Sequence, residues 1–103
     1  MKSYKYERCK AIYVVDYQTF DVVIDLGFRL TVKERLQMNV EIEVPQPKYG
    51  IVKRILSDLL WNKELTLETL KHPFYGVWLA NVYIDGKSIN LEYFKQVTEA
   101  LES

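Results

Sequence analysis

The sequence has little of what builds a disulfide scaffold, a zinc site or a membrane anchor. It contains one cysteine, Cys9, and one histidine, His72, so the chain can form neither an internal disulfide nor a zinc site of Cys and His ligands. Its apolar runs, such as residues 22–24 and 59–61, are far too short to cross a bilayer. The first ten residues lack the apolar stretch of a signal peptide. We therefore expect a cytoplasmic protein that does not engage a membrane.

An excess of charge of one sign is also missing. The 14 Lys and Arg residues balance the 14 Asp and Glu residues, giving a formal net charge of zero. No global positive field therefore draws the chain to nucleic acid or to anionic lipid, although a local basic patch stays open. With 103 residues, 49% of them hydrophobic and 14% aromatic, the chain has material for one packed core. We expect a single domain over residues 1–103.

The first half of the sequence has the pattern of β-strands. Residues 4–15 alternate partly between Tyr, Ile or Val and charged side chains, and residues 19–26 are rich in β-branched side chains before Gly27. Residues 28–44 form the third expected strand, with mostly apolar even positions interrupted by Glu34. A strand of this length must bend or change sheets, as strands do at the corners of small barrels.

The period changes after Pro45-Gln46-Pro47. Residues 49–61 carry apolar side chains at helical spacing, and Asn62 suits the helix C-terminus. Two further strands are expected at 65–70 and 77–84, followed by a turn and by a second helix that starts with Asn90 as N-cap. This order is that of a five-stranded OB barrel with a helix between strands three and four and a C-terminal helix. On periodicity alone, an SH3-like barrel or another α+β domain competes with it.

Short segments in a fixed order resemble the staphylococcal-nuclease (thermonuclease-like) family. Residues 14–22 resemble its first hairpin motif "V-x-D-G-D-T-x-x-V", and residues 65–69 resemble its "V-T-L-E-T". Residues 25–28 are typical of its phage and mobile-element members. The remaining matching segments are residues 33–36, 42–46, 75–83 and 85–90. The resemblance implies a five-stranded OB fold, and in the family this fold supports calcium-assisted phosphodiester hydrolysis.

The resemblance also implies that most of the catalytic set is lost. A calcium ligand of the family falls on Gln18, a neutral amide, and its second metal carboxylate falls on Glu43. The general base falls on Gln46, which cannot accept a proton near neutral pH. Hard cations need carboxylate oxygens. We therefore expect a degraded calcium site, with no metal and no cofactor.

The rest of the first hairpin motif has a structural reading. Asp16 and Thr19 persist, and we expect them to organise the turn through side-chain to backbone hydrogen bonds. Tyr17 occupies the position of a glycine and adopts positive φ less readily. These positions therefore favour a hairpin turn over a metal site.

The two arginines of the family, which stabilise charge on the transferring phosphate, are also replaced. One falls on Gln37 or Met38, and Arg35 lies nearby but out of register. The other falls on Val77, beside Tyr75. We expect no hydrolysis at a useful rate.

Three functional hypotheses remain. We favour an inactive nuclease-like domain that binds a protein partner or a second copy, with the old cleft made less polar by Tyr17, Phe74 and Val77. The resemblance to phage members suggests a regulatory or inhibitory protein in a host cytoplasm. The alternative is a non-cleaving binder of single-stranded nucleic acid or nucleotide, which would use the following cations: Lys33, Arg35, Lys48, Lys53 and Arg54. The last is a weak calcium-dependent nuclease with Asp16 and Glu43.

Overall fold

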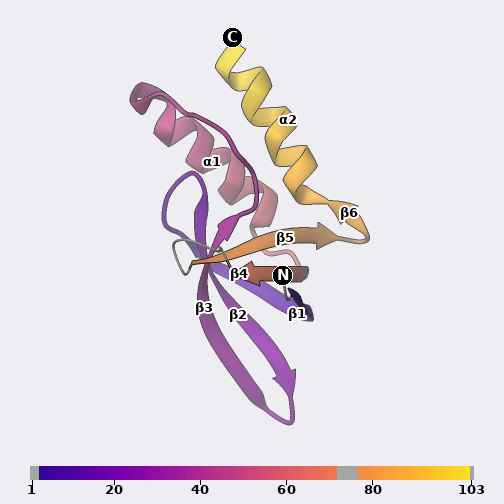
Figure 1. Cartoon of the computed structure of the whole chain (residues 1–103). Helices are drawn as coiled ribbons and strands as arrows, with labels where there is room; N and C mark the ends of the chain where they lie inside the picture. Colours follow the sequence, from indigo (N-terminus) through magenta and orange to yellow (C-terminus); the bar gives the residue numbers. More distant parts are fainter. Residues whose placement is uncertain (1–2, 72–76, 103) are drawn as a thin grey trace.

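Strands form the lower part of the molecule and two helices cover its upper end (Figure 1). The computed structural model describes residues 3–71 and 77–102. The strands are β1 (Ser3–Val14), β2 (Thr19–Gly27), β3 (Leu30–Met38), β4 (Leu65–Lys71), β5 (Trp78–Ile84) and β6 (Lys87–Ser88). The helices are α1 (Tyr49–Leu60), preceded by a 3₁₀ turn at Gln46–Lys48, and α2 (Ile89–Glu102).

The sheet closes on itself. Its strand order is β3-β2-β1-β4-β5-β6, and a parallel pairing of β3 with β5 joins the two sides through Gln37 with Leu79 and Met38 with Ala80. All other strand pairs are antiparallel. The prediction of a barrel-like α+β fold with two helices is therefore confirmed, and β6 adds a short strand that was not expected.

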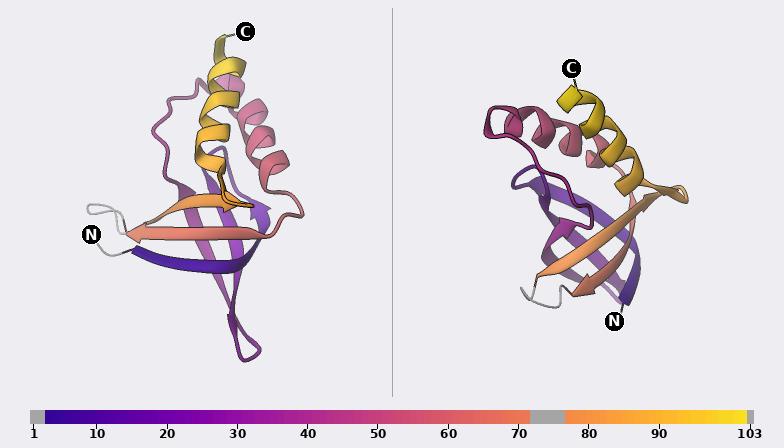
Figure 2. Two further views of the ribbon diagram at one scale, coloured as in Figure 1. Left: turned by 90° about the vertical axis from the view of Figure 1, so that its right-hand side faces the viewer. Right: turned by 45° about the horizontal axis from the view of Figure 1, so that its top comes forward.

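The core lies inside this barrel and under the helices. α1 turns Val52, Leu56 and Leu60 inward, and α2 turns Tyr93 and Val97 inward. Figure 2 shows the two helices side by side over one end of the barrel. The strands contribute the remaining fully buried apolar side chains, which are Cys9, Phe20, Val22, Leu65, Leu67, Ala80 and Val82.

The bend expected in the third strand occurs elsewhere. β3 ends at Met38 instead of continuing to residue 44, because the Met38 amide donates to the Gln18 carbonyl at 2.8 Å and the Val40 amide turns back to the Met38 carbonyl. β1 is the strand that bends: its register shifts between Tyr6 and Cys9, where it leaves β4, and again near Ala11 on β2. The corner of the barrel is therefore made by the first strand.

The second helix does not begin as predicted. Asn90 is buried and is not the N-cap; the Ser88 hydroxyl instead accepts a hydrogen bond from the Leu91 amide. The Asn90 side chain accepts from the Val82 amide at 2.7 Å and donates to the Ala80 carbonyl at 3.0 Å. It therefore ties α2 to β5. Asn62, by contrast, takes the left-handed conformation expected after the first helix, with φ of 52°.

Candidate functional site

The turn between β1 and β2 carries the residues that resemble the first hairpin motif of the nuclease family. The Asp16 carboxylate accepts a hydrogen bond from the Gln18 amide at 2.9 Å, which confirms its predicted role in the turn. Thr19 takes part through its backbone carbonyl, which accepts from the Val15 amide at 2.8 Å. Tyr17 is not among the described residues with positive φ, so the expected strain at this position is absent.

Aromatic side chains fill the space beside this turn. The rings of Tyr17 and Tyr49 lie 5.1 Å apart between centroids. The Tyr93 hydroxyl, reaching from α2, donates a hydrogen bond to the Tyr17 carbonyl. Burial raises the pKa of Tyr93 above its ordinary value, and burial raises that of Tyr17 as well, with smaller contributions from Tyr49 and Asp16. Both hydroxyls stay neutral at physiological pH, and the turn is held by packing and hydrogen bonds.

Several of the degenerate positions do come together at this end of the barrel. Thr19 pairs with Gln37 across β2 and β3, and the Gln18 carbonyl accepts from the amide that follows Gln37. Gln37 pairs in turn with Leu79, two residues beyond Val77. Met38, the other candidate for the arginine position, is buried in the core. Of these two candidates, Gln37 is therefore the one on the outer face of β3.

The remaining predicted positions differ in their exposure and contacts. Glu43 and Gln46 are exposed, Gln46 at the start of the 3₁₀ turn. Lys48, expected as a binding cation, is half-buried, and its ammonium donates to the Ala100 carbonyl in the last turn of α2 at 3.0 Å. Phe74 and Tyr75 lie outside the described residues. Within residues 3–71 and 77–102, no group of three or more His, Cys, Asp or Glu side chains is placed to hold a metal ion.

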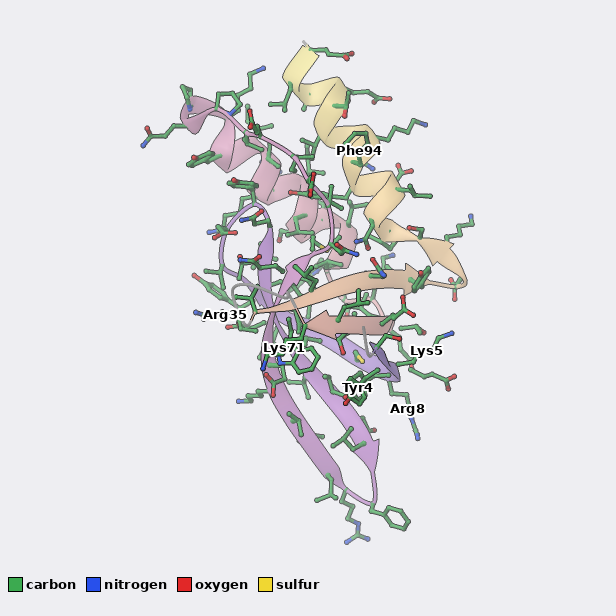
Figure 3. All side chains as sticks on the ribbon, in the orientation of Figure 1. Tyr4, Lys5, Arg8, Arg35, Lys71 and Phe94 are labelled. Carbon is green, nitrogen blue, oxygen red and sulfur yellow. The ribbon has the colours of Figure 1, made fainter. Side chains whose placement is uncertain are left out.

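An ion pair marks the outer face of β2 and β3. Arg35 donates to Asp21 from two nitrogens, at 2.8 Å and 3.1 Å, and this contact lowers the pKa of Asp21. Arg35 lies two residues from Gln37 in β3, so the two side chains share a face. Figure 3 shows Arg35 beside the barrel. Sequence reasoning missed this pair because only strand register places residues 21 and 35 opposite one another.

Toward their shared turn, β2 and β3 continue together as a hairpin, which we call the β2–β3 arm (residues 25–34). Its residues 32–34 still pair with residues 22–24 of β2, which β1 flanks on the other side. β1 pairs with β2 only as far as Cys9 with Ile24, and the tip of the arm projects beyond the other described elements in Figures 1 and 2. Its exposed apolar side chains are Leu26 (48% exposed), Phe28 (98%), Leu30 (60%) and Val32 (36%). The alternating pattern of residues 28–44 predicted a buried face here, but neighbouring strands stop before they can cover it.

A small cavity opens where the arm leaves the barrel. Its volume is about 120 Å³, and it is lined by side chains of five strands: Tyr6, Ile24, Glu34, Leu36, Thr69 and Trp78. Glu34 belongs to the same face of β3 as the buried Leu36. It therefore places a carboxylate at an otherwise largely apolar opening.

No protein-family model matches the sequence, and no curated protein matches it significantly. Among the described residues, no helix is both long enough and apolar enough to span a membrane. The functional argument therefore depends on the geometry of these surfaces.

Proposed function

We propose that the chain is a nuclease-like OB-fold domain without a hydrolytic centre, which acts as a binding module for a protein partner. The strand connectivity supports an OB fold: β1, β2 and β3 form a meander, β3 meets β5, and β4 returns to β1. The position of α1 between β3 and β4 agrees with this assignment. The nuclease-like relation depends on the sequence motifs.

The lack of hydrolysis follows from side-chain chemistry. Amides stand at Gln18 and Gln46, where a metal ligand and a base would be needed, and Val77 stands at an arginine position. The guanidinium of Arg35 is engaged by Asp21. Removal of one donor to the transition state already costs about 3 kcal/mol, so the combined changes leave little catalysis.

The proposed binding function rests on the exposure of apolar side chains on the β2–β3 arm. A small domain usually buries large apolar side chains, yet this hairpin extends four of them away from the core. Protein interfaces use such apolar and aromatic anchors, whereas phosphate backbones select cations. The arm therefore suits a protein surface better than a nucleic acid.

Site-specific photocrosslinking tests this proposal. A photoreactive phenylalanine analogue at Phe28 should give one discrete crosslinked protein in source cells, and the same analogue at Phe94 on α2 (47% exposed) serves as the control. Failure of the Phe28 position to give any product beyond that of the Phe94 position would sink the proposal. A crosslink only to a second copy, accompanied by a dimer in light scattering, would identify a homo-oligomer.

A non-cleaving nucleic-acid binder is the second candidate, and one row of side chains favours it. Lys10 pairs with Val23 and Val23 with Lys33, which places two cations on the outer face of β1–β3, near the exposed Tyr13. Nearby acidic groups, including Asp21 and Asp25, offset this charge. Fluorescence anisotropy with labelled single-stranded oligonucleotides at low salt tests it, and absence of binding would exclude it.

A weak nuclease is tested in the same samples. Calcium-dependent digestion that disappears on Glu43→Ala or Asp16→Ala would restore that hypothesis, since these are the carboxylates left at the degenerate site. Both side chains are exposed, so the variants should fold normally. We expect no digestion by the unmodified protein.

A further inference from the structure

The outer edge of β3 in the arm is an open sheet edge. β3 pairs with β2 along its whole length but with β5 only at Gln37 and Met38. Within the described residues, no other backbone hydrogen bond reaches residues 30–36. Every second residue on this edge therefore directs an amide and a carbonyl away from the strands that the structure describes, which is the arrangement that accepts an added strand.

Two opposite charges sit at the middle of this edge. Lys33 lies on the outer face of the arm, and Glu34 lies on the inner face at the mouth of the cavity of Tyr6 and Trp78. Neither forms an ion pair with the described residues. An added strand can therefore be selected by its charges.

The same edge of a second copy, β3 against β3, fits poorly. Opposite residues in an antiparallel pair share a face, so a copy related by a twofold axis would place only odd-numbered β3 residues against Lys33 and only even-numbered ones against Glu34. The residues offered to Lys33 are Thr31, Lys33, Arg35 and Gln37, none acidic, and those offered to Glu34 are Leu30, Val32, Glu34, Leu36 and Met38, none basic. Like charges directly opposite one another destabilise a sheet.

We propose that β3 binds an extended segment of another protein by antiparallel strand addition, and that this segment carries a basic residue opposite Glu34 followed by an acidic residue opposite Lys33. The two following inward positions are apolar, against Val32 and Leu30. The pattern from N- to C-terminus is basic, acidic, apolar, any, apolar. This inference rests on the proposed protein-binding function and specifies its partner.

The inward basic residue has a defined place. Its side chain points to the same face as Glu34 and meets the cavity of about 120 Å³ beside the rings of Tyr6 and Trp78. A carboxylate together with aromatic rings attracts a lysine or arginine cation. The cavity therefore supplies specificity, and the β3 edge supplies the main-chain hydrogen bonds.

Synthetic peptides test the inference directly. The peptide TKEVTVT has the proposed pattern, and TEKVTVT exchanges its two charges. TKEVPVT places a proline, which has no backbone N–H, opposite Thr31, where strand addition needs an amide donor. In a titration followed by amide NMR spectra, TKEVTVT should shift the resonances of residues 30–36 and bind about tenfold more tightly than TEKVTVT, since two cross-strand pairs change sign. TKEVPVT should bind most weakly.

The charge-exchanged protein provides the reciprocal experiment. Lys33→Glu combined with Glu34→Lys leaves the net charge unchanged and alters only exposed positions, so the variant should fold and should prefer TEKVTVT. Equal binding of all three peptides, shifts that map away from β3, or no shifts at millimolar peptide would each overturn the inference. A discrete protein crosslink at Phe28 without peptide binding would leave the proposed function standing and reject only this mode. Displacement of TKEVTVT by single-stranded DNA from residues 30–36 would also reject it, in favour of a nucleic acid.

Discussion

The helix-covered end of the barrel and the β2–β3 arm differ in how far their inward-facing apolar side chains are buried. At the covered end, the helix faces that meet the barrel are buried and their polar groups are paired: Tyr93 donates to the Tyr17 carbonyl, and Asn90 bonds to the backbone of β5. Only the outer surface of this end exposes large apolar side chains, among them Trp61 and Leu91. On the arm, Leu30 and Phe28 face solvent. The same strands, β2 and β3, pass through both regions.

This difference separates what holds the fold from what is offered to a partner. Burial of a large apolar side chain contributes about 2 kcal/mol to the free energy of unfolding. The exposed side chains of the arm do not make this contribution, whereas those of the core do. The turn between β1 and β2 is therefore part of what holds the fold, whereas the arm keeps apolar side chains exposed.

The largest expected effect lies at the covered end. Asn90→Ala removes the acceptor of the buried Val82 amide and one donor to Ala80, and should lower the free energy of unfolding by about 2–3 kcal/mol. Urea unfolding followed by circular dichroism measures the change. Asn39→Ala is the matched control: Asn39 is exposed and its side chain donates to Asn81, so the loss should be about 0.5 kcal/mol. Equal losses would contradict the buried role of Asn90.

The two regions can be compared with one substitution made twice. Val22→Thr buries a hydroxyl in the core and should cost about 2 kcal/mol, whereas Val32→Thr on the arm should cost less than about 0.5 kcal/mol. Both positions lie on the inward face of neighbouring strands, so β-propensity changes equally. Thermal unfolding of the two variants measures the difference. Similar costs would mean that the arm face is buried in solution, for example in a homo-oligomer.

Cys9 lies at the boundary between the barrel and the arm, because its pairing with Ile24 is the last pair between β1 and β2 before the arm begins. Burial, with a smaller contribution from Glu64, raises the pKa of the Cys9 thiol to about 11. The folded state holds the proton more tightly than the unfolded state, so the associated stability is complete below pH 9 and is lost as the pH rises toward 11. Between pH 8.5 and 10 the free energy of unfolding of the unmodified protein should fall by about 1 kcal/mol more than that of the Cys9→Ala variant. Parallel pH profiles would show that Cys9 reaches solvent and the boundary is open.

Much of the fold could be predicted from the sequence, since local patterns decide it. The helix expected at residues 49–61 is found at Tyr49–Leu60, and both Asp85 and Gly86 have positive φ in the expected tight turn. The errors arose where tertiary contacts decide. The sequence pattern could not show that bonds from Met38 end β3, or that Asn90 is buried against β5.

The candidate site was predictable in part. The role of Asp16 in the turn follows from a side-chain to backbone hydrogen bond between residues that are close in the sequence. The pairing of Arg35 with Asp21 depends on strand register, and the exposed arm depends on where β1 stops pairing with β2. Neither leaves a signal in a single sequence. A surface that depends on strand register is therefore harder to predict from sequence than a local turn.

The smallest expected effect lies at the tip of the arm, where Phe28 and Arg29 have φ of 52° and 64°. A two-residue hairpin turn with both residues at positive φ favours Asn-Gly, so Phe28→Asn combined with Arg29→Gly should raise the free energy of unfolding by about 0.5–1 kcal/mol. Asp85→Asn, in a turn that already has glycine, should change it by less than about 0.3 kcal/mol. Urea unfolding measures both. An unchanged stability would mean that the arm unfolds independently of the barrel. A gain would show instead that the exposed Phe28 is kept at a cost to the folded state, as expected of a side chain that serves a partner.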